Sequence, residues 1–486
     1  MNKKLYLVLF IAFIHVLVSA QDTTEIVIGS NLIEDAYINS EIFDPNGNGP
    51  TLMSSHWIED ETPNFGRSLL KFDLSDIPER SIITAASLSL FHDSTGHSNI
   101  GGENSGIVLR VAEDWADNTV IWYEQPLTSI VNAVVLEAPD SSKQDYTNID
   151  LTKMVQNFVD HPDNSNGIMV KLFDEVLAYR SLVFASVDNE NEQIKPKLNI
   201  SYVQNVHHDT IVVLQPGAED GKDAYVNVVY GTPNGSRNTL VLSVWNYNPG
   251  GFGIGRSLLE FDLSEIPPEF VLRKAELSLF HNYSSVHYGH STLGGANNLL
   301  VQRIIEPWAE DLVYWDNQPE TTEIHEVVLP STHFEKQQFL NIDVTEMVND
   351  IFADNNYGFL LRLEDESYDK PTRSLVFGSS DHEDPDLWPK LELFFINTSS
   401  INNKPISPLY FNVFPNPTKG TVNVELSKTG SSSGTYSIIN PNGLTVLSGS
   451  FSTKSFAIDA TSLPKGMYAI RLINNGSTSI KKLIIL

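Results

Sequence analysis

The most constraining feature of this sequence is an internal duplication that covers most of its length. Residues 66–78, GRSLLKFDLSDIP, return as GRSLLEFDLSEIP at residues 255–267. Other matched pairs, 188 to 193 residues apart, are Tyr37 and Tyr225, Trp115 and Trp308, Trp122 and Trp315, Asn148 and Asn341, and Arg180 and Arg373. Because similarity at a fixed period marks a structural unit that is used again, the sequence predicts two tandem modules, at residues 21–205 and 206–397.

Within each module, apolar residues stand in short runs of the kind that β-strands contain. Residues 87–91, SLSLF, and residues 358–363, GFLLRL, are examples, and Gly, Pro, Asn and Asp separate such runs. Short alternating runs at close spacing indicate antiparallel sandwiches. We therefore expect an all-β fold in which both modules are jelly rolls.

One short helix is expected in each module. Asp150 and Asp343 stand where a side chain can cap a helix N-terminus, ahead of residues 153–159 and 346–352. These two helices would be the exceptions in a chain made of strands.

The first 20 residues have the pattern of a secretory signal peptide, residues 1–20. Lys3 and Lys4 precede an apolar run, and residues 18–20, Val-Ser-Ala, form a small-residue cleavage site. The apolar run is shorter than the roughly 20 residues that span a membrane, and no other stretch is long and uncharged enough. The sequence therefore predicts an exported protein without a membrane span.

The sign of the charge changes near the C-terminus. Residues 398–408 are rich in Ser, Asn, Lys and Pro without periodicity, which is typical of a linker. Residues 409–486 hold seven Lys and Arg against two Asp and Glu, whereas the whole chain has a formal net charge of −30. We expect residues 409–486 to form a separate domain.

Composition removes several classes of function. The chain has no cysteine, which excludes cysteine nucleophiles, zinc–thiolate sites and iron–sulfur clusters. The acidic balance argues against a nucleic acid partner, because affinity for nucleic acid comes from neutralising phosphates.

Four short motifs mark residues 409–486. They are FPNPTKG at residues 414–420, IINPNG at 438–443, LPKGMY at 463–468 and KKLIIL at 481–486. With these motifs the domain resembles the type A C-terminal domain of proteins exported by the type IX (Por) secretion system of Bacteroidetes. The resemblance implies a small β-sandwich that serves as an export address, with the type IX machinery as its partner. It also implies transport through the periplasm and outer membrane to the cell surface or the medium.

The duplicated modules share a longer pattern. Each contains Arg-Ser-Leu-Leu-x-Phe-Asp-Leu-Ser-x-Ile-Pro, a Trp-x6-Trp pair with Gln-Pro, then Asn-Ile-Asp and Arg-Ser-Leu-Val-Phe, over residues 25–202 and 210–396. This pattern resembles the DNRLRE group, also called carbohydrate-binding module family 96. The resemblance implies an acidic algal polysaccharide, especially alginate, as the partner. In its module-only architecture the whole chain is also similar to flavobacterial ulvan lyases.

The two modules differ most in the loop after a shared strand that ends at His281 in the second copy. There the loop, residues 281–295, is four residues longer than its counterpart and adds Tyr283, His287 and Tyr288. What one copy has alone is a candidate for function, whereas shared residues more easily belong to the scaffold.

Cleavage of a uronic-acid polymer by β-elimination needs a base, an acid and a positive charge that neutralises the uronate carboxylate. His287 and Tyr288 are the predicted base and acid, and Arg303, on a strand expected to run beside the loop, is the predicted charge. Further substrate contacts are expected from Tyr283, His290, His281 and Arg256. We interpret the chain as an endo-acting ulvan or alginate lyase on these grounds.

The alternative is a non-catalytic carbohydrate-binding or adhesion protein. The loop residues would then stack on sugars or pack on the rim of the sandwich. The four matched tryptophans either fill the cores or stack on sugars. Arg67 and Arg256 either pair with uronate or sulfate in bidentate fashion or satisfy buried carboxylates such as Asp73 or Asp262.

An acidic loop makes Ca²⁺ a candidate ligand. Asp44, Asn46 and Asn48 place side-chain oxygens at alternate positions around a Gly turn. The twelfth position of this loop is Ser55 in place of the closing Glu, so a plain Asn-Gly turn is the other interpretation. Residues 381–386, DHEDPD, form a second acidic loop with the same ambiguity. An anionic substrate would need local arginines or calcium to offset the acidic modules.

Overall fold

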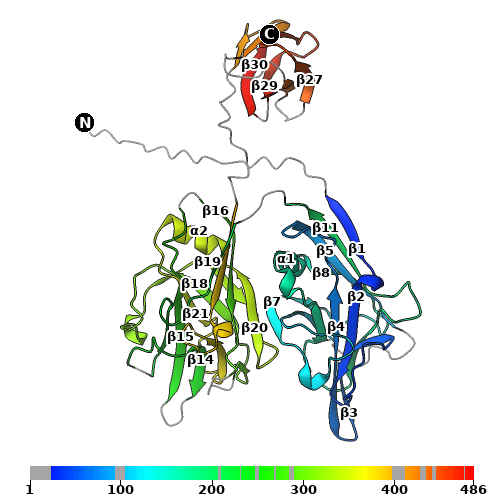
Figure 1. Cartoon of the computed structure of the whole chain (residues 1–486), viewed down its shortest axis with the longest axis vertical. Coiled ribbons are helices and arrows are strands. Elements are labelled where there is room, and N and C mark those ends of the chain that lie inside the picture. Colours follow the sequence, from blue (N-terminus) through cyan, green and yellow to red (C-terminus); the bar gives the residue numbers. More distant parts are fainter. Residues whose placement is uncertain are drawn as a thin grey trace. The chain divides into compact units, whose positions relative to one another are not determined.

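The computed structural model of the chain (Figure 1) describes residues 23–93, 104–205, 210–229, 231–246, 251–267, 270–283, 289–396, 411–426, 434–440, 445–474 and 477–486. The chain divides into two compact units, Met1–Asn397 and Thr398–Leu486. No helix within the described ranges is both long and apolar enough to cross a membrane. The predicted signal peptide, residues 1–20, and the predicted linker, residues 398–408, lie outside the described residues.

The first module is a sandwich of two antiparallel sheets. Its strands are β1 (Thr24–Ile28), β2 (Ile33–Asn39), β3 (Thr51–Glu59), β4 (Thr62–Phe72), β5 (Ile82–Leu90), β6 (Gly106–Val111), β7 (Thr128–Leu136), β8 (Tyr146–Asp150), β9 (Ile168–Leu172), β10 (Arg180–Ala185) and β11 (Lys197–Val203). One sheet has the order β1-β11-β5-β8 and the other β10-β3-β4-β9-β6-β7, with β2 paired to β4. Inward side chains such as Leu88, Phe184 and Ile200 form the core between the sheets.

The second module has the same arrangement. Its strands are β12 (Thr210–Leu214), β13 (Lys222–Asn227), β14 (Thr239–Asn246), β15 (Phe252–Glu260), β16 (Val271–Leu279), β17 (Ser291–Thr292), β18 (Leu299–Ile304), β19 (Thr321–Leu329), β20 (Gln337–Asp343), β21 (Phe359–Leu363), β22 (Arg373–Gly378) and β23 (Lys390–Ile396). The sheet orders are β12-β23-β16-β20 and β17-β22-β14-β15-β21-β18-β19, with β13 paired to β15. Apart from the added β17, each strand takes the place of its counterpart in the first module. The predicted all-β class and the duplication are confirmed.

One α-helix in each module follows an aspartate that accepts hydrogen bonds from the first residue of the helix. The helices are α1 (Thr152–Asp160) and α2 (Thr345–Ala353). Asp150 Oδ1 accepts hydrogen bonds from the backbone N–H and the hydroxyl of Thr152, and Asp343 accepts the same two from Thr345. Both predicted helices are confirmed, each one residue longer at either end. Short 3-10 helices occur at Ser30–Leu32 (η1), Trp122–Glu124 (η2), Pro162–Asn164 (η3), Trp315–Asn317 (η4) and Pro385–Leu387 (η5).

The two modules share a sheet and part of a core, which the sequence did not predict. β7 of the first module pairs in parallel with β20 of the second, with Thr128 opposite Gln337. This pairing joins one sheet of each module into a continuous sheet of 11 strands. The apolar core of the second module includes first-module residues, namely Ile107, Leu109, Ile130 and Val131. The sandwiches expected in series are therefore fused into one body.

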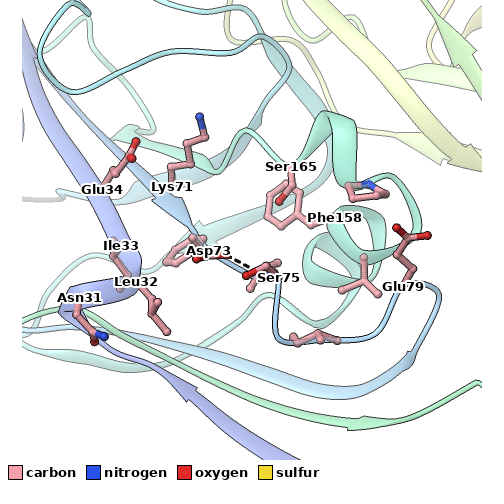
Figure 2. Close-up of a pocket in the computed structure, with 15 residues that line it drawn as sticks. Asn31, Leu32, Ile33, Glu34, Lys71, Asp73, Ser75, Glu79, Phe158 and Ser165 are labelled. Atoms are coloured by element: carbon pink, nitrogen blue, oxygen red, sulfur yellow. Dashed lines mark hydrogen bonds between the residues drawn. The ribbon is translucent and has the colours of Figure 1, made fainter.

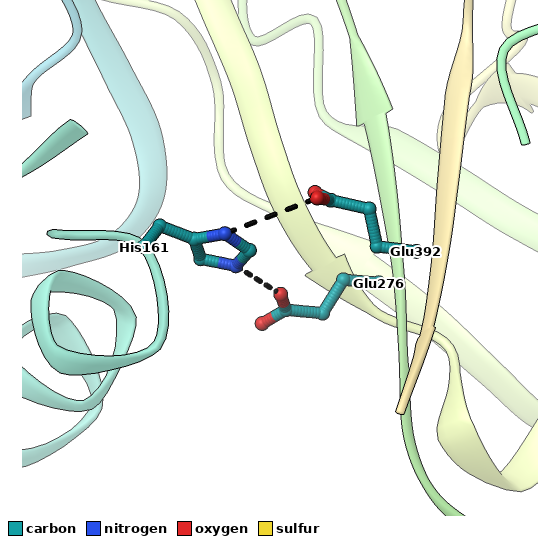
Figure 3. A group of neighbouring side chains, drawn as sticks. All are labelled: His161, Glu276 and Glu392. Atoms are coloured by element: carbon teal, nitrogen blue, oxygen red, sulfur yellow. Dashed lines mark hydrogen bonds and ion pairs between the residues drawn. The ribbon is translucent and has the colours of Figure 1, made fainter. Parts of the chain in front are cut away.

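A buried ionic network crosses this junction. His161, directly after α1, lies between Glu276 of β16 and Glu392 of β23 (Figure 3), with its Nε2 2.7 Å from Glu276 Oε2. Lys274 Nζ lies 2.5 Å from Glu276 Oε1 and 2.7 Å from Asp160 Oδ2. Burial by itself would raise the pKa of Glu276, but the hydrogen bond from His161 and the charge of Lys274 outweigh it and hold this pKa at about 2. The carboxylate of Glu276 is thus paired on both sides.

The C-terminal unit is a small sandwich of its own. One sheet holds β24 (Phe411–Phe414), β25 (Thr421–Leu426) and β28 (Ser455–Asp459), and the other holds β26 (Gly434–Ile439), β27 (Thr445–Phe451), β29 (Gly466–Asn474) and β30 (Ser477–Ile485). Val422, Ile438, Ile470 and Leu483 belong to its core. The predicted C-terminal β-sandwich is confirmed.

Candidate binding pocket

A pocket of about 390 Å³ lies at the edge of the second module, where the inserted loop ends. Its lining includes Trp245, His290, Thr292, Leu293, His333 and Phe334. Trp245 is near the end of β14, and Thr292 is on β17, which pairs with the other side of β22. The segment 332–335 comes from the connection between β19 and β20. Three separate parts of the chain therefore build the pocket.

The pocket has an aromatic wall and a polar rim. Trp245 is partly exposed, and Leu293 at the rim is 87% exposed. A partly exposed indole presents an apolar face on which the C–H face of a sugar ring can stack, while polar groups at the rim fix the orientation of the ligand. Glu335, which lines the pocket, is exposed, and so is Lys336, the next residue in the sequence. The arrangement suits a small ring with one apolar face and polar substituents.

Side chains of the first module pack against two residues that line the pocket. Phe334 packs against the guanidinium of Arg67, 4.6 Å from the ring centroid, and against the ammonium of Lys171 at 5.5 Å. His333 meets Phe173 edge-on, with the ring centroids 4.8 Å apart. Because Arg67, Lys171 and Phe173 belong to the first module, the shape of the pocket depends on the junction between the modules.

The histidines in and beside the pocket are buried or half-buried. His290 accepts a hydrogen bond from the backbone N–H of Val376 at Nδ1 and donates one to the carbonyl of Gln337 from Nε2. Burial lowers the pKa of His290 to about 3, and it lowers those of His281 and His333 to about 4. A base that abstracts a proton needs a pKa near the working pH, so none of these three histidines fits that role. Of the predicted contacts, His290 lines the pocket, and His281 packs against its ring.

The predicted base and acid, His287 and Tyr288, lie outside the described residues. The segment that carries them ends at Gly289, which lines the pocket. Tyr283, a predicted substrate contact, is 59% exposed, and its hydroxyl donates to Asp384 Oδ2 at 2.5 Å. This hydrogen bond raises the pKa of Tyr283. Tyr283 is therefore bonded to the second acidic loop and does not line the pocket.

Arg303 lies away from the loop. The expectation that its strand runs beside the loop is wrong, because β18 pairs with β19 and β21, whereas β17, at the end of the loop, pairs with β22. The jelly-roll topology places strands that follow one another in sequence at distant positions of the sheet. Arg303 instead forms an ion pair with Asp354, at 3.5 Å. Its match Arg110 is buried in the junction and donates to the carbonyl of Leu340 and to Asn341 Oδ1.

Arg256, another predicted substrate contact, has its donors occupied. Its Nε and Nη2 form a bidentate pair with Glu366, and its Nη1 donates to Gln318 Oε1. The same three bonds link Arg67 to Glu175 and Gln125. The interpretation that these arginines satisfy carboxylates is confirmed, but the suggested partners Asp73 and Asp262 are wrong. Those two accept hydrogen bonds from backbone N–H groups two residues further on, which leaves Glu175 and Glu366 to the arginines.

The four matched tryptophans belong to the scaffold. Trp115 and Trp308 donate their indole N–H groups to backbone carbonyls at 2.8 and 2.9 Å. Trp122 and Trp315 lie against the guanidinium groups of the matched arginines, at 4.3 and 4.8 Å from the ring centroids. Packing is therefore the interpretation that fits their surroundings.

Sequence reasoning missed Trp245. It has a match, Trp57, and both follow the pattern Ser-x-Trp, at Ser55 and Ser243. Both indoles are partly exposed, but Trp57 packs edge-on against Tyr179, whereas Trp245 lines the pocket. The shared Ser-x-Trp pattern was the signal that could have drawn attention to these residues.

The acidic loop predicted to bind calcium lies on the surface. Asp44 and Asn48 are exposed and Asn46 is half-buried. The loop packs on Asp117 through Gly47, where a Cβ would come within 2.6 Å of Asp117 Cβ. The loop thus lies beside a carboxylate that comes from another part of the chain.

A second cavity, of about 640 Å³, lies in the first module, and Figure 2 shows the residues that line it. Glu34, Lys71, Asp73 and Glu79 lie around it, and Phe158 comes from α1. The ammonium of Lys71 is already bonded to Asp114, at 2.6 Å. Three carboxylates around one neutralised cation do not suit an anionic polymer.

Comparison with solved structures gives only remote similarity. The matches include β-glucuronidase 3 of Bacteroides uniformis, with 11% identity over 47% of this chain and 26% of that chain and a TM-score of 0.13. They also include the β-glucuronidase of Ruminococcus gnavus in complex with uronic isofagomine, with 9% identity, 58% and 44% coverage and a TM-score of 0.15. The BSP domain of a biofilm associated protein is 11% identical over 90% of this chain and 81% of that chain, with a TM-score of 0.15. This chain spans less than half the length of those two enzymes, and similarity at these TM-scores says nothing about its fold or activity.

Two family models match the chain directly, while no curated protein matches it. The model of the secretion system C-terminal sorting domain matches residues 412–486, which directs the protein through type IX secretion to the cell surface or the extracellular space. The model of carbohydrate-binding module family 96 matches residues 28–202 and 218–391, one match for each sandwich. The chain therefore belongs to carbohydrate-binding module family 96, as a tandem pair of modules followed by a sorting domain.

Proposed function

We propose that this protein is a non-catalytic carbohydrate-binding protein that holds uronate-containing polysaccharide outside the cell. The observation that carries the proposal is the pocket at Trp245, where a partly exposed indole lines a cavity that the first module supports through Phe334. Membership of a carbohydrate-binding family supports a sugar as the ligand. The sorting domain supports a place of action outside the cell.

A uronate carboxylate needs a positive partner, because the modules as a whole are acidic. Lys336 is exposed and directly follows Glu335, which lines the pocket. Burial is the main cause of the lowered pKa of His281, and the positive charge of Lys336 is the second cause. The donors of Arg67 and Arg256 are already occupied by carboxylates and amides. We therefore assign Lys336 as the residue that meets the uronate carboxylate.

An endo-acting ulvan or alginate lyase is the second candidate. The observation that favours it is that Gly289, the residue after His287 and Tyr288 in the sequence, lines the pocket. Since His290 and His333 have pKa values of about 3 and 4, the base of such a lyase would have to come from the inserted loop.

Affinity electrophoresis tests the binding proposal. The mature protein is run in gels that contain ulvan, alginate, carrageenan or a neutral glucan. We expect retardation in ulvan or alginate and not in the glucan, with weaker retardation for Trp245→Ala and for Lys336→Gln. Equal mobility of the wild type in every gel would remove carbohydrate binding from the account.

An absorbance assay separates binding from cleavage. A lyase leaves an unsaturated uronate that absorbs in the ultraviolet, because β-elimination creates a double bond beside the carboxylate. We expect no rise in absorbance when the protein is incubated with ulvan or alginate. A rise that His287→Ala abolishes would replace the binding proposal by the lyase.

A further inference from the structure

Three carboxylates of the second module that do not line the pocket come together. Oxygens of Asp223, Glu310 and Asp381 all lie within 4.8 Å of one another. Asp223 is on β13, Glu310 is in the connection after β18, and Asp381 follows β22. The fold therefore gathers these three negative charges from three distant parts of the sequence.

The central carboxylate is buried and incompletely bonded. Asp223 is 1% exposed, its Oδ2 accepts a hydrogen bond from the backbone N–H of Ser380 at 2.7 Å, and its Oδ1 has no hydrogen-bond partner. Asp381 Oδ2 is also buried without a hydrogen-bond partner. A buried, unpaired carboxylate oxygen is costly unless a cation or a donor meets it. Two such oxygens in one cluster call for a shared ligand.

The surroundings of Asp223 show what kind of ligand is needed. Burial first, and then the charges of Asp381 and Glu310, raise the pKa of Asp223 to about 7. The charge of Lys222 lowers the pKa of Glu310. Its ammonium, however, lies 2.6 Å from Glu260 Oε2 and over the ring of Trp308. The cluster therefore has an excess of negative charge that its neighbours do not offset.

We propose that Asp223, Glu310 and Asp381 bind one Ca²⁺ ion. Calcium takes oxygen ligands at 2.3–2.6 Å, so two ligand oxygens on one ion lie at most about 5 Å apart, and the cluster meets this limit. Calcium also accepts irregular geometry and six to eight ligands, so water and backbone carbonyls can complete the shell. Magnesium demands a tighter, near-octahedral arrangement and is the weaker candidate.

The neighbouring loop is built to fit this cluster closely. Gly235 lies against Glu310, and a Cβ at this position would collide with its side chain and come within 2.6 Å of its carbonyl oxygen. Gly47 of the first module lies against Asp117 in the same way. Only a residue without a side chain allows the loop to hold the carboxylate in place.

The duplication supplies a second, independent observation. Asp35, Asp117 and Asp188 of the first module match the three carboxylates of the second. Asp35 is 2% exposed, its Oδ2 accepts a hydrogen bond from the backbone N–H of Val187, and its Oδ1 has no hydrogen-bond partner. Both modules thus have the same unpaired buried oxygen beside two further acids. Between these two sets, only the second-module oxygens all come within 4.8 Å, so we assign the tighter site to that module.

The other acidic cluster of the described chain does not share this property. His161, Glu276 and Glu392 also lie close together (Figure 3), but Lys274 is 2.5 Å from Glu276 and Lys390 is 2.9 Å from Glu392. Protein cations already occupy the place that a metal ion would take. This contrast is the reason to locate calcium at Asp223 and not at the junction.

Thermal unfolding of the mature protein in EDTA and in roughly 5 mM Ca²⁺ tests the proposal, because extracellular calcium modules bind in the range of about 10⁻⁴ to 10⁻³ M. We expect calcium to raise the melting temperature of the wild type by about 3–6 °C. Asp223→Asn should lose at least half of this rise, and Asp35→Asn/Asp223→Asn should lose all of it. In EDTA, Asp223→Asn should melt at or above the wild type, because the variant removes a buried charge.

Two further variants keep the test decisive if Asp223→Asn does not fold. Asp381→Asn, at a half-buried position, should also lose at least half of the rise, and Asp369→Asn, at an exposed position outside the cluster, should keep all of it. Terbium luminescence excited through Trp308, two residues before Glu310, should appear in the wild type and disappear in Asp223→Asn. No rise with calcium in the wild type, or an undiminished rise in both Asp223→Asn and Asp381→Asn, would overturn the proposal.

Discussion

Arg256 and Glu366 form a bidentate ion pair that is mostly shielded from water, with 23% and 13% of their side chains exposed. Arg256→Gln removes the bidentate partner of Glu366 and leaves it Arg362, at 3.9 Å, and we expect a loss of about 2–4 kcal/mol in the free energy of unfolding. Urea denaturation measures this loss, and Arg256→Gln/Glu366→Gln should recover part of it. A variant that unfolds like the wild type but no longer binds polysaccharide would show that Arg256 contacts the ligand.

Buried His290 contributes to the sensitivity of the second module to mild acid. Burial lowers the pKa of His290 to about 3, whereas the unfolded value is about 6.5. The unfolded chain binds this proton more readily, so stability is fully present above about pH 6.5 and falls as the pH decreases toward 3. At pH 5 the expected loss is about 2 kcal/mol. Denaturation at pH 7.5 and pH 5 should show a smaller loss for His290→Gln, and an equal loss in both proteins would contradict this assignment.

At the scale of secondary-structure elements, an aspartate stabilises the N-terminus of each helix. It stands two residues before the first residue of the helix. Asp343→Ala removes the acceptor for the backbone N–H and the hydroxyl of Thr345. We expect a loss of about 1 kcal/mol in the free energy of unfolding, which chemical denaturation can measure. Asp343→Asn keeps an acceptor oxygen and should remain close to the wild type. Equal loss in both variants would mean that the charge, and not the hydrogen bond, matters.

Local patterns were sufficient to predict the strands and helices. These patterns act over a few residues, as in the alternation in residues 87–91 and the aspartates before α1 and α2. Because of the duplication, each pattern could be read twice in the sequence. The pairing of β7 with β20 could not be predicted, because it joins Thr128 to Gln337 across 209 residues and is not repeated among the described strands of the two modules. Residues at matched positions of the two modules also make different contacts. Arg110 is buried in the junction, while Arg303 forms an ion pair with Asp354.

The candidate pocket was predicted only as a region. The extra length of the second-module loop drew attention to this edge of the sandwich, and Gly289 and His290 at the end of the loop line the pocket. Trp245 and Phe334 could not be assigned to it, because the strand order that brings β14, β17 and the segment before β20 together is a property of the whole sheet. The burial that lowers the pKa of His290 is likewise a tertiary effect.

At the scale of the whole molecule, the shared sheet and core make the two modules one unfolding unit. We expect calorimetry of the mature protein without its sorting domain, which forms a separate compact unit, to show one transition for both modules. Two well-separated transitions in the wild type would contradict the shared core.

The junction should also respond to acid through Glu276. Its pKa is held at about 2, so its contribution to stability is present above about pH 4.5 and is lost as the pH falls toward 2. We expect Glu276→Gln to lose about 3 kcal/mol of unfolding free energy at neutral pH, and the difference from the wild type should shrink below pH 4.5. A difference that does not depend on pH would mean that packing, and not charge, explains the effect.

The central claim is that the pocket at Trp245 binds polysaccharide, and the duplication provides a matched control for it. Trp57 occupies the same position in the first module but packs against Tyr179. Isothermal titration of alginate and ulvan oligosaccharides into the wild type, Trp245→Ala and Trp57→Ala measures the claim directly. We predict that Trp245→Ala weakens binding at least about tenfold, which corresponds to about 1.4 kcal/mol, while Trp57→Ala binds like the wild type. Wild-type affinity in Trp245→Ala would contradict the account.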